Sequence, residues 1–331
     1  MMISDRNQSA AVIFILLGFP EYPEFQILLF LLFLAIYMVT VMGNLGMIAI
    51  IIMNPKLHTP MYFFLKHLSF VDFCYSTTVP KLLENLVAED RTISIPACIT
   101  QFFFMANCAL SDTFMLEVMV YDRFVAICNP PLYVVIMSQK RCTLFMAAGY
   151  SWGKLFSLLF TYTLLILSFC GTSIINNFVC EYSGILSASC SDKHFSQLIL
   201  FIIANFNMLS TLMVIFTSYI FIFVTVMKMH SARARHKAFS TCASHLTAVG
   251  IFYGTVLFLY CIPNGKNSML TIKVGSVFCA MVIPMLNPLI YSLRNKDMKE
   301  TLGKLMDKKM ISHWIITVIT RINNSINKNS N

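Results

Sequence analysis

Long apolar runs alternate with short polar segments along the whole chain. Seven of these runs approach or exceed the roughly 20 residues that a helix needs to cross the hydrocarbon core of a bilayer. They cover residues 25–53, 60–81, 97–128, 142–169, 197–228, 239–262 and 271–293. Several contain polar interruptions, and the first and fifth runs are the clearest. The pattern predicts an all-α membrane protein, a bundle of seven transmembrane helices with short connections.

Composition supports the membrane interpretation. Of the 331 residues, 57% are hydrophobic and 12% are charged, whereas soluble globular domains average about 45–50% apolar and about 25% charged residues. A soluble fold of this length has too little interior to bury so much apolar surface. The bilayer is the solvent in which that surface can stay exposed.

The basic residues are distributed unevenly across the predicted membrane. Of the 24 Lys and Arg residues, sixteen fall on the side that includes the C-terminus, six fall on the opposite side, and Lys66 and Lys154 lie inside spans. Positive residues concentrate in cytoplasmic loops, so we expect the N-terminus outside and the C-terminus inside. The formal net charge of +9 therefore reflects topology and contact with anionic lipids rather than nucleic-acid binding.

The segment before the first span, residues 1–24, is expected to be extracellular. Residues 11–17 are apolar but too short to span, and no basic leader precedes them, so we identify no cleavable signal peptide. Asn7 begins an Asn-Gln-Ser glycosylation acceptor on the outer side. A second acceptor at Asn323 lies on the inner side and is expected to remain unglycosylated.

Four of the 11 cysteines fall at outer-side positions, where the environment permits disulfides. We favour pairs between Cys98 and Cys180 and between Cys170 and Cys190, although four cysteines allow three connectivities and the spacing does not choose among them. Only His194 lies near these cysteines, which argues against a zinc site. The other seven cysteines lie in spans, where a small buried hydrophobic role is expected.

Short motifs recur at particular places in the spans. They are Gly43-Asn44, LHTPMYFFL at 57–65, LSFVD at 68–72, MVYDRFVAIC at 119–128, Ser218-Tyr219, KAFSTCASHL at 237–246 and PMLNPLIY at 284–291. In this order and spacing, the chain resembles the olfactory receptors, a branch of the rhodopsin-like (class A) G-protein-coupled receptors, from about Phe14 to Asp297.

The resemblance implies several properties. It implies a receptor domain over residues 25–294, a cytoplasmic amphipathic helix and tail over 295–331, and the two disulfides favoured above. It further implies a small-molecule odorant as ligand and a heterotrimeric G protein of the stimulatory olfactory type that raises cAMP. The expected location is the plasma membrane of sensory cilia, as a multi-pass protein.

The chain departs from the family pattern at a few positions. Val120 and Phe124 replace the usual Ala and Tyr, Asn177 replaces a His, Pro131 adds a second proline after Pro130, and the tail after about residue 310 is long. These departures leave the fold unchanged and the efficiency of coupling open.

Ionisable residues inside spans are costly and usually functional. Asp72 and Asp112 lie at comparable depth, and the resemblance puts Asn44 and Asn287 near them. We interpret them as a polar cluster that rearranges on activation, with Na⁺ as the candidate ion at Asp72 and Asp112 and with no other cofactor expected. The alternative is a static hydrogen-bonded core.

Asp122 and Arg123 lie at the inner end of the third span. An arginine held by its neighbouring aspartate can move to a new partner when helices separate, so we interpret the pair as an activation switch; the alternative is a static ion pair. Pro288 permits a kink. Tyr219 and Tyr291 are expected to line the inner half of the bundle, with ordinary packing as the alternative.

The outer half of the bundle is the expected ligand pocket, because pockets between helices are mostly apolar. Counting along the helices gives twelve candidate lining residues: Met105, Ala106, Ala109, Leu110, Ile203, Asn207, Tyr253, Val256, Leu257, Tyr260, Val277 and Ala280. The set contains no carboxylate, which favours a small, mostly apolar, neutral ligand over an amine.

Other function classes fit less well. The chain has no glycine-rich phosphate loop, no HExxH pair and no nucleophile elbow, so an enzyme is not expected. A small transporter is the closest alternative, but it would predict inverted repeats and interrupted helices in matching halves, and no such repeat is visible.

Two charges inside spans belong to no motif. Glu117 and Lys154 both lie about 16–18 Å from the predicted inner boundary, at 1.5 Å per residue. Their helices are expected to be antiparallel neighbours, so an interhelical ion pair is one hypothesis. The alternative is that one residue faces a polar cavity and the other reaches separately toward the membrane surface.

Overall fold

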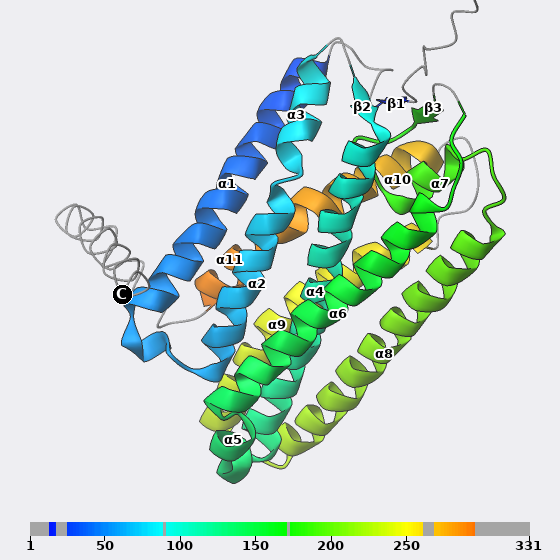
Figure 1. The fold of residues 1–331 in the computed structure, drawn as a ribbon. Helices are drawn as coiled ribbons and strands as arrows, with labels where there is room; N and C mark the ends of the chain where they lie inside the picture. The colour runs from blue at the N-terminus through cyan, green and yellow to red at the C-terminus, as the bar shows by residue number, and fades with distance from the viewer. Residues whose placement is uncertain (1–12, 18–24, 89–90, 171–172, 261–267, 295–331) are drawn as a thin grey trace, which may run out of the picture.

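The computed structural model describes residues 13–17, 25–88, 91–170, 173–260 and 268–294. Figure 1 shows a bundle of long helices with a small sheet at one end. The helices are α1 (Gln26–Met53), α2 (Pro60–Ser76), α3 (Val79–Val87), α4 (Ile95–Cys128), α5 (Pro130–Ile136), α6 (Gln139–Leu165), α7 (Tyr182–Ser187), α8 (His194–Met227), α9 (Ala232–Tyr260), α10 (Ser268–Val277) and α11 (Ile283–Arg294), with the short turns η2 (Pro55–Leu57) and η3 (Phe278–Val282). The expected tail over 295–331 lies outside the described residues.

The seven predicted spans are confirmed as seven helical segments of one bundle. Spans two and seven are composite: α2 continues into α3, and α10 continues through the π-turn η3 into α11. Among the described residues, four segments are apolar and long enough to cross a membrane by length and composition alone: Gln26–Met53, Ile95–Cys128, His194–Met227 and Lys273–Tyr291. The other spans carry more polar residues or are broken.

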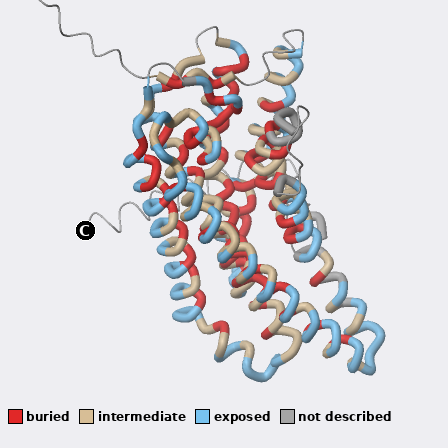
Figure 2. Tube along the Cα trace, turned by 90° about the vertical axis from the view of Figure 1, so that its right-hand side faces the viewer, coloured by how far each residue is buried: buried red, intermediate tan, exposed pale blue. Residues whose placement is uncertain are grey.

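Exposure follows the pattern expected in a bilayer. Buried residues concentrate where helices face one another, and exposed residues follow the outward helix faces (Figure 2). Many exposed residues are large and apolar; Leu28, Phe201 and Met213 are each more than half exposed. Such continuous apolar surface on α1 and α8 would promote aggregation in water, whereas lipid tails cover it without cost.

The break between α2 and α3 follows from Pro80, which has no N–H to donate to the preceding turn. Three consecutive hydroxyls compensate for the interruption: Ser76 donates to the carbonyl oxygen of Phe73 at 2.7 Å, Thr77 to Cys74 at 2.6 Å and Thr78 to Tyr75 at 3.0 Å. Backbone groups at membrane depth need such partners because lipid offers none.

A three-stranded sheet, absent from the all-α expectation, closes one end of the bundle. The strands β1 (Ile13–Leu16), β2 (Thr92–Ser94) and β3 (Ser173–Ile175) are ordered β2-β1-β3. Ile13 pairs antiparallel with Ser94, and Ile15 pairs parallel with Ile174. We call this the sheet end, and the opposite end, where α5 lies, the α5 end (Figure 1).

Two glycines mark close approaches between spans. A Cβ at Gly153 of α6 would lie 2.7 Å from the backbone oxygen of Asn107 on α4, so only glycine permits this spacing. A Cβ at Gly43 of α1 would lie 3.2 Å from Cγ of Pro288 on α11. The second contact brings the first and last spans together beside the polar residues described next.

Candidate functional site

Arg123 and Asp122 lie near the end of α4 at the α5 end. Arg123 Nη2 is 3.3 Å from Asp122 Oδ2, and the Asp122 side chain is almost completely buried. Tyr133 of α5 donates its hydroxyl to Asp122 Oδ1 at 2.9 Å. Burial and the adjacent Asp122 carboxylate raise the pKa of Tyr133, so this phenol remains a donor. Asp122 is therefore held from two sides.

Tyr133 was not among the residues predicted from the sequence. Its role depends on α5 folding back beside α4, which the Asn129-Pro130-Pro131 segment permits by ending one helix and starting another. Tyr219 of α8 and Tyr291 of α11 were predicted here. Both lie close enough to Arg123 to interact with it electrostatically.

The structure assembles the predicted polar cluster from four spans. Asn287 of α11 donates to Asp72 Oδ2 of α2 at 3.0 Å, and Asn44 of α1 donates to the carbonyl oxygen of Pro284 at 3.0 Å. Asp112 of α4 is near enough to Asp72 for electrostatic interaction. All four side chains are buried.

Three oxygens of this cluster have no hydrogen-bond partner among the described residues: Asn44 Oδ1, Asp72 Oδ1 and Asp112 Oδ1. Two carboxylates in a buried site repel unless a proton or a cation compensates for them. Carboxylate and carbonyl oxygens are the ligands that hard cations prefer. The donor set therefore fits a small hard cation.

Half of the predicted pocket residues lie in or against one apolar cluster near the sheet end. Met105 of α4, Ile203 of α8, Val277 of α10 and Ala280 of η3 belong to it, with Ala106 and Leu110 packed against it. The cluster extends to Phe178, Val179 and Tyr182, which follow β3. The loop between α6 and α8 thus covers the helices from the sheet end.

The α9 residues of the predicted pocket are divided among different environments. Tyr253 is buried in a separate cluster with Val120, Ile215 and Val249. Leu257 is 42% exposed, whereas Val256 is partly buried; adjacent helical positions differ by about 100° in direction. Tyr260 ends α9, and its side chain lies outside the described residues.

Asn207 joins three helices. It accepts a hydrogen bond from Trp152 Nε1 of α6 at 3.3 Å through Oδ1 and donates to Thr113 Oγ1 of α4 at 3.4 Å through Nδ2. Ala109 lies beside this region on α4 and is partly buried. Much of the hydrogen-bonding capacity of Asn207 is therefore already used within the protein.

The hypothesis of a Glu117–Lys154 ion pair is wrong. Glu117 of α4 accepts a hydrogen bond from Thr211 of α8, with Tyr253 close enough to interact electrostatically. Lys154 is exposed on α6 and has no ion pair among the described residues. Gly153, next to Lys154, lies against Asn107 and Ser111 of α4, so Lys154 is level with a part of α4 at least six residues from Glu117, and the two charges face different neighbours.

Glu181, directly after Cys180, is a carboxylate that the predicted pocket lacked. Its two oxygens accept hydrogen bonds from Ser276 of α10 at 3.1 Å and from Ser183 at 3.2 Å. Its charge also acts on Cys279 and Tyr75. Its position beside a disulfide-bonded cysteine was the only sequence signal for it.

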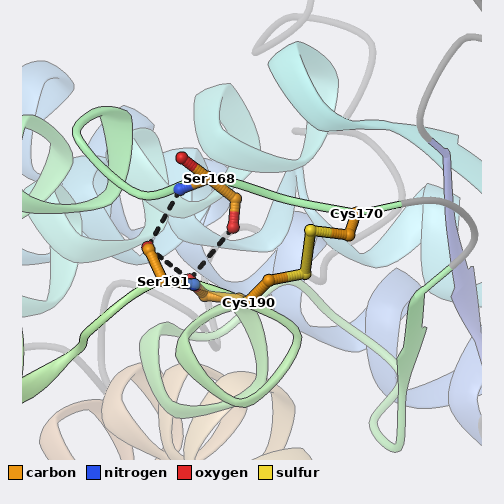
Figure 3. Close-up of a disulfide and its surroundings, with 5 residues drawn as sticks. Ser168, Cys170, Cys190 and Ser191 are labelled. Carbon is orange, nitrogen blue, oxygen red and sulfur yellow. Dashed lines mark hydrogen bonds between the residues drawn. A yellow bond between two sulfur atoms is a disulfide. The ribbon is translucent and has the colours of Figure 1, made fainter.

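Both favoured disulfides are confirmed. Cys98 at the start of α4 pairs with Cys180, with Cα atoms 5.4 Å apart, and both residues are fully buried. Cys170 pairs with Cys190, with Cα atoms 6.1 Å apart. Figure 3 shows the second bridge beside Ser168, which accepts from the Cys190 N–H and donates its own N–H to Ser191 Oγ, both at 3.0 Å.

Comparisons with known proteins agree with this arrangement. A family profile described as olfactory receptor matches residues 33–309. The chain is 61% identical to olfactory receptor 5D13 of Homo sapiens over 314 residues, which are 95% of this chain and 100% of that protein. It is 57% identical to olfactory receptor 1165 of Mus musculus, with coverage of 95% and 99%.

A solved structure shares the fold. Squid rhodopsin superposes with a TM-score of 0.69 at 15% sequence identity, covering 87% of this chain and 82% of that one. This similarity concerns the helical bundle alone. The profile match and the close relatives identify the family itself: this chain belongs to the olfactory receptors, which are multi-pass plasma-membrane receptors, not enzymes, that sense odorants and act through heterotrimeric G proteins.

Proposed function

We propose that the chain binds a small, mostly apolar, neutral odorant near the sheet end and activates a G protein of the stimulatory olfactory type, which raises cAMP. The observation that carries this proposal is the apolar cluster that joins α4, α8, α10 and η3 beneath the disulfide-anchored loop. Glu181 adds one polar group whose oxygens already have hydroxyl donors. It therefore offers the odorant one hydrogen-bond acceptor at the edge of an otherwise apolar site.

We further propose that the polar cluster of Asp72, Asp112, Asn44 and Asn287 rearranges on activation and holds Na⁺ in one state. Three unpartnered buried oxygens and two neighbouring carboxylates support this assignment. A cation there would stabilise the arrangement of α1, α2, α4 and α11 to which it binds.

The ligand site can be tested with two adjacent isoleucines. Ile203 is 8% exposed and belongs to the apolar cluster, whereas Ile202 is 52% exposed on the outward face of α8. After an odorant panel with a cAMP readout has identified an agonist, Ile203→Phe should change its half-maximal concentration by about tenfold or more, because one added group in an apolar pocket has an effect of that size.

Ile202→Phe is the matched control, since it makes the same change on the surface that faces lipid. Both variants are compared at equal surface expression. A receptor in which Ile202→Phe alters the response as much as Ile203→Phe does not bind its odorant in this cluster. If the odorants of the panel change another second messenger but do not raise cAMP, the proposed coupling is contradicted.

Topology is proposed with the sheet end outside the cell and the α5 end in the cytoplasm, where basic loops contact anionic lipid. Asn7 and Asn323, the two glycosylation acceptors, lie outside the described residues. We expect Asn7→Gln to remove the glycosidase-sensitive mobility shift of the expressed receptor and Asn323→Gln to leave it unchanged. A shift that depends on Asn323 would reverse the topology.

A further inference from the structure

A cavity of about 460 Å³ lies at the α5 end, between the α1–α2 connection and the start of α6. Its apolar wall includes Ile51, Ile52 and Phe63, and its polar groups include His58, Lys66 and Gln139. Neither the proposed odorant site nor the proposed Arg123 switch uses these residues. The cavity is therefore a separate feature of the fold.

Lys66 is the cation of this cavity. Its ammonium lies 5.2 Å from the centroid of the Phe63 ring, and it forms no ion pair with a carboxylate among the described residues. Lys66 follows the start of α2 by six residues, about 9 Å along the helix, so it lies inside the span. An unpaired charge at that depth is costly unless a counter-charge is available.

The other polar groups of the cavity favour an anion as well. No aspartate or glutamate is among the described lining residues. Pro60 and Gln139, both lining residues, are the first residues of α2 and α6, and helix starts carry partial positive charge.

The apolar groups indicate where the anion comes from. Ile52 is 48% exposed, so the cavity wall continues onto the helix surface that faces lipid. A soluble phosphate ion makes no favourable contact with that apolar surface, whereas the acyl chain of a phospholipid can pack against it. Charge and apolar surface together match a molecule with an anionic head and a hydrocarbon tail.

We propose that this cavity binds an anionic phospholipid of the inner leaflet, with its phosphate at Lys66 and an acyl chain along Ile52. The choice of leaflet rests on the topology proposed above; the site itself does not. A bound lipid would link the α1–α2 connection to the start of α6, beside α5 and its Tyr133 contact with Asp122.

The test uses the full-length receptor purified into nanodiscs of phosphatidylcholine with or without phosphatidylserine, and native mass spectrometry counts the retained phosphatidylserine. Lys66→Met should weaken retention about fivefold, the effect expected of one basic residue near an anionic membrane surface. Lys154→Met is the matched control: it removes another lysine inside a span, which is exposed on α6 and does not line the cavity. It should leave retention unchanged.

Further arms keep the result decisive. Lys66→Arg should retain the lipid. Gln139→Glu introduces a negative charge at an exposed position on the cavity rim and should weaken lipid retention. It tests the proposal even if Lys66→Met does not fold. Equal retention by Lys66→Met and the unmodified receptor, or equal loss in Lys154→Met, overturns the proposal. Displacement of phosphatidylserine by inorganic phosphate would show a soluble-anion site instead. Because nanodiscs have no inside, a reversed topology does not affect this result.

Discussion

Replacing Arg123 with alanine is expected to abolish odorant-stimulated cAMP production. Arg123 is the cation beside buried Asp122 at the α5 end, within electrostatic reach of Tyr219 and Tyr291. Without it, the Asp122 carboxylate loses its counter-charge, and the proposed switch loses the group that would exchange partners between states. The measurement is cAMP against odorant concentration, at matched surface expression.

Arg141→Ala is the control for that experiment, because it removes an exposed guanidinium at the start of α6 and leaves the Asp122 contacts intact. Tyr133→Phe should have the opposite effect on signalling and raise basal cAMP. It removes the hydrogen bond that Tyr133 donates to Asp122, and a hydrogen bond to a charged group contributes about 1.5–3 kcal/mol. Full odorant response in Arg123→Ala would contradict the switch assignment.

Cys98→Ser and Cys180→Ser are each expected to remove the receptor from the cell surface. The bridge between them closes a loop of 82 residues and joins the start of α4 to the loop over the pocket. Loss of a native disulfide typically costs about 2–5 kcal/mol, a large share of the roughly 5–15 kcal/mol that keeps a typical protein folded. Surface labelling with an antibody to an extracellular tag measures the effect.

The double variant Cys98→Ser/Cys180→Ser should behave like either single variant, because one bridge is lost in all three. Cys108→Ser is the matched control, since Cys108 is a free cysteine on the same helix. Normal surface levels in either single variant would mean that the bridge is dispensable. A loss in Cys108→Ser equal to that in Cys98→Ser would attribute the effect to cysteine replacement in α4 as such.

Features carried by apolar runs or by motifs of the family could be predicted from the sequence. The seven spans follow from apolar runs, and the contact of Asn287 with Asp72 and both disulfides follow from motifs whose spatial relation the family shares. Predictions of these features stay correct even when each helix boundary is wrong by one or two residues.

Features that depend on helix rotation or on loops could not be predicted. Glu117 and Lys154 are offset along their helices, because Gly153 lies against Asn107 and Ser111 of α4. Glu117 is turned toward Thr211, and Lys154 is exposed. Leu257 is 42% exposed, while Tyr253 on the same helix is buried, for the same reason. Glu181 and Tyr133 lie in connections between spans that fold back on the bundle. Local sequence does not encode how close these connections come to the spans.

The small sheet has a consequence for the biosynthesis of the receptor. β1 is made first, but its parallel partner β3 is made only after α1, α2, α4 and α6 have been synthesised. At translation rates of about 5–20 residues per second, β1 waits about 10–30 s for that partner. During this interval Phe14 and Leu16, fully buried in the finished fold, lack the contacts that β3 provides. Release from the endoplasmic reticulum is therefore expected to depend on chaperones that occupy this strand until the second half of the receptor arrives.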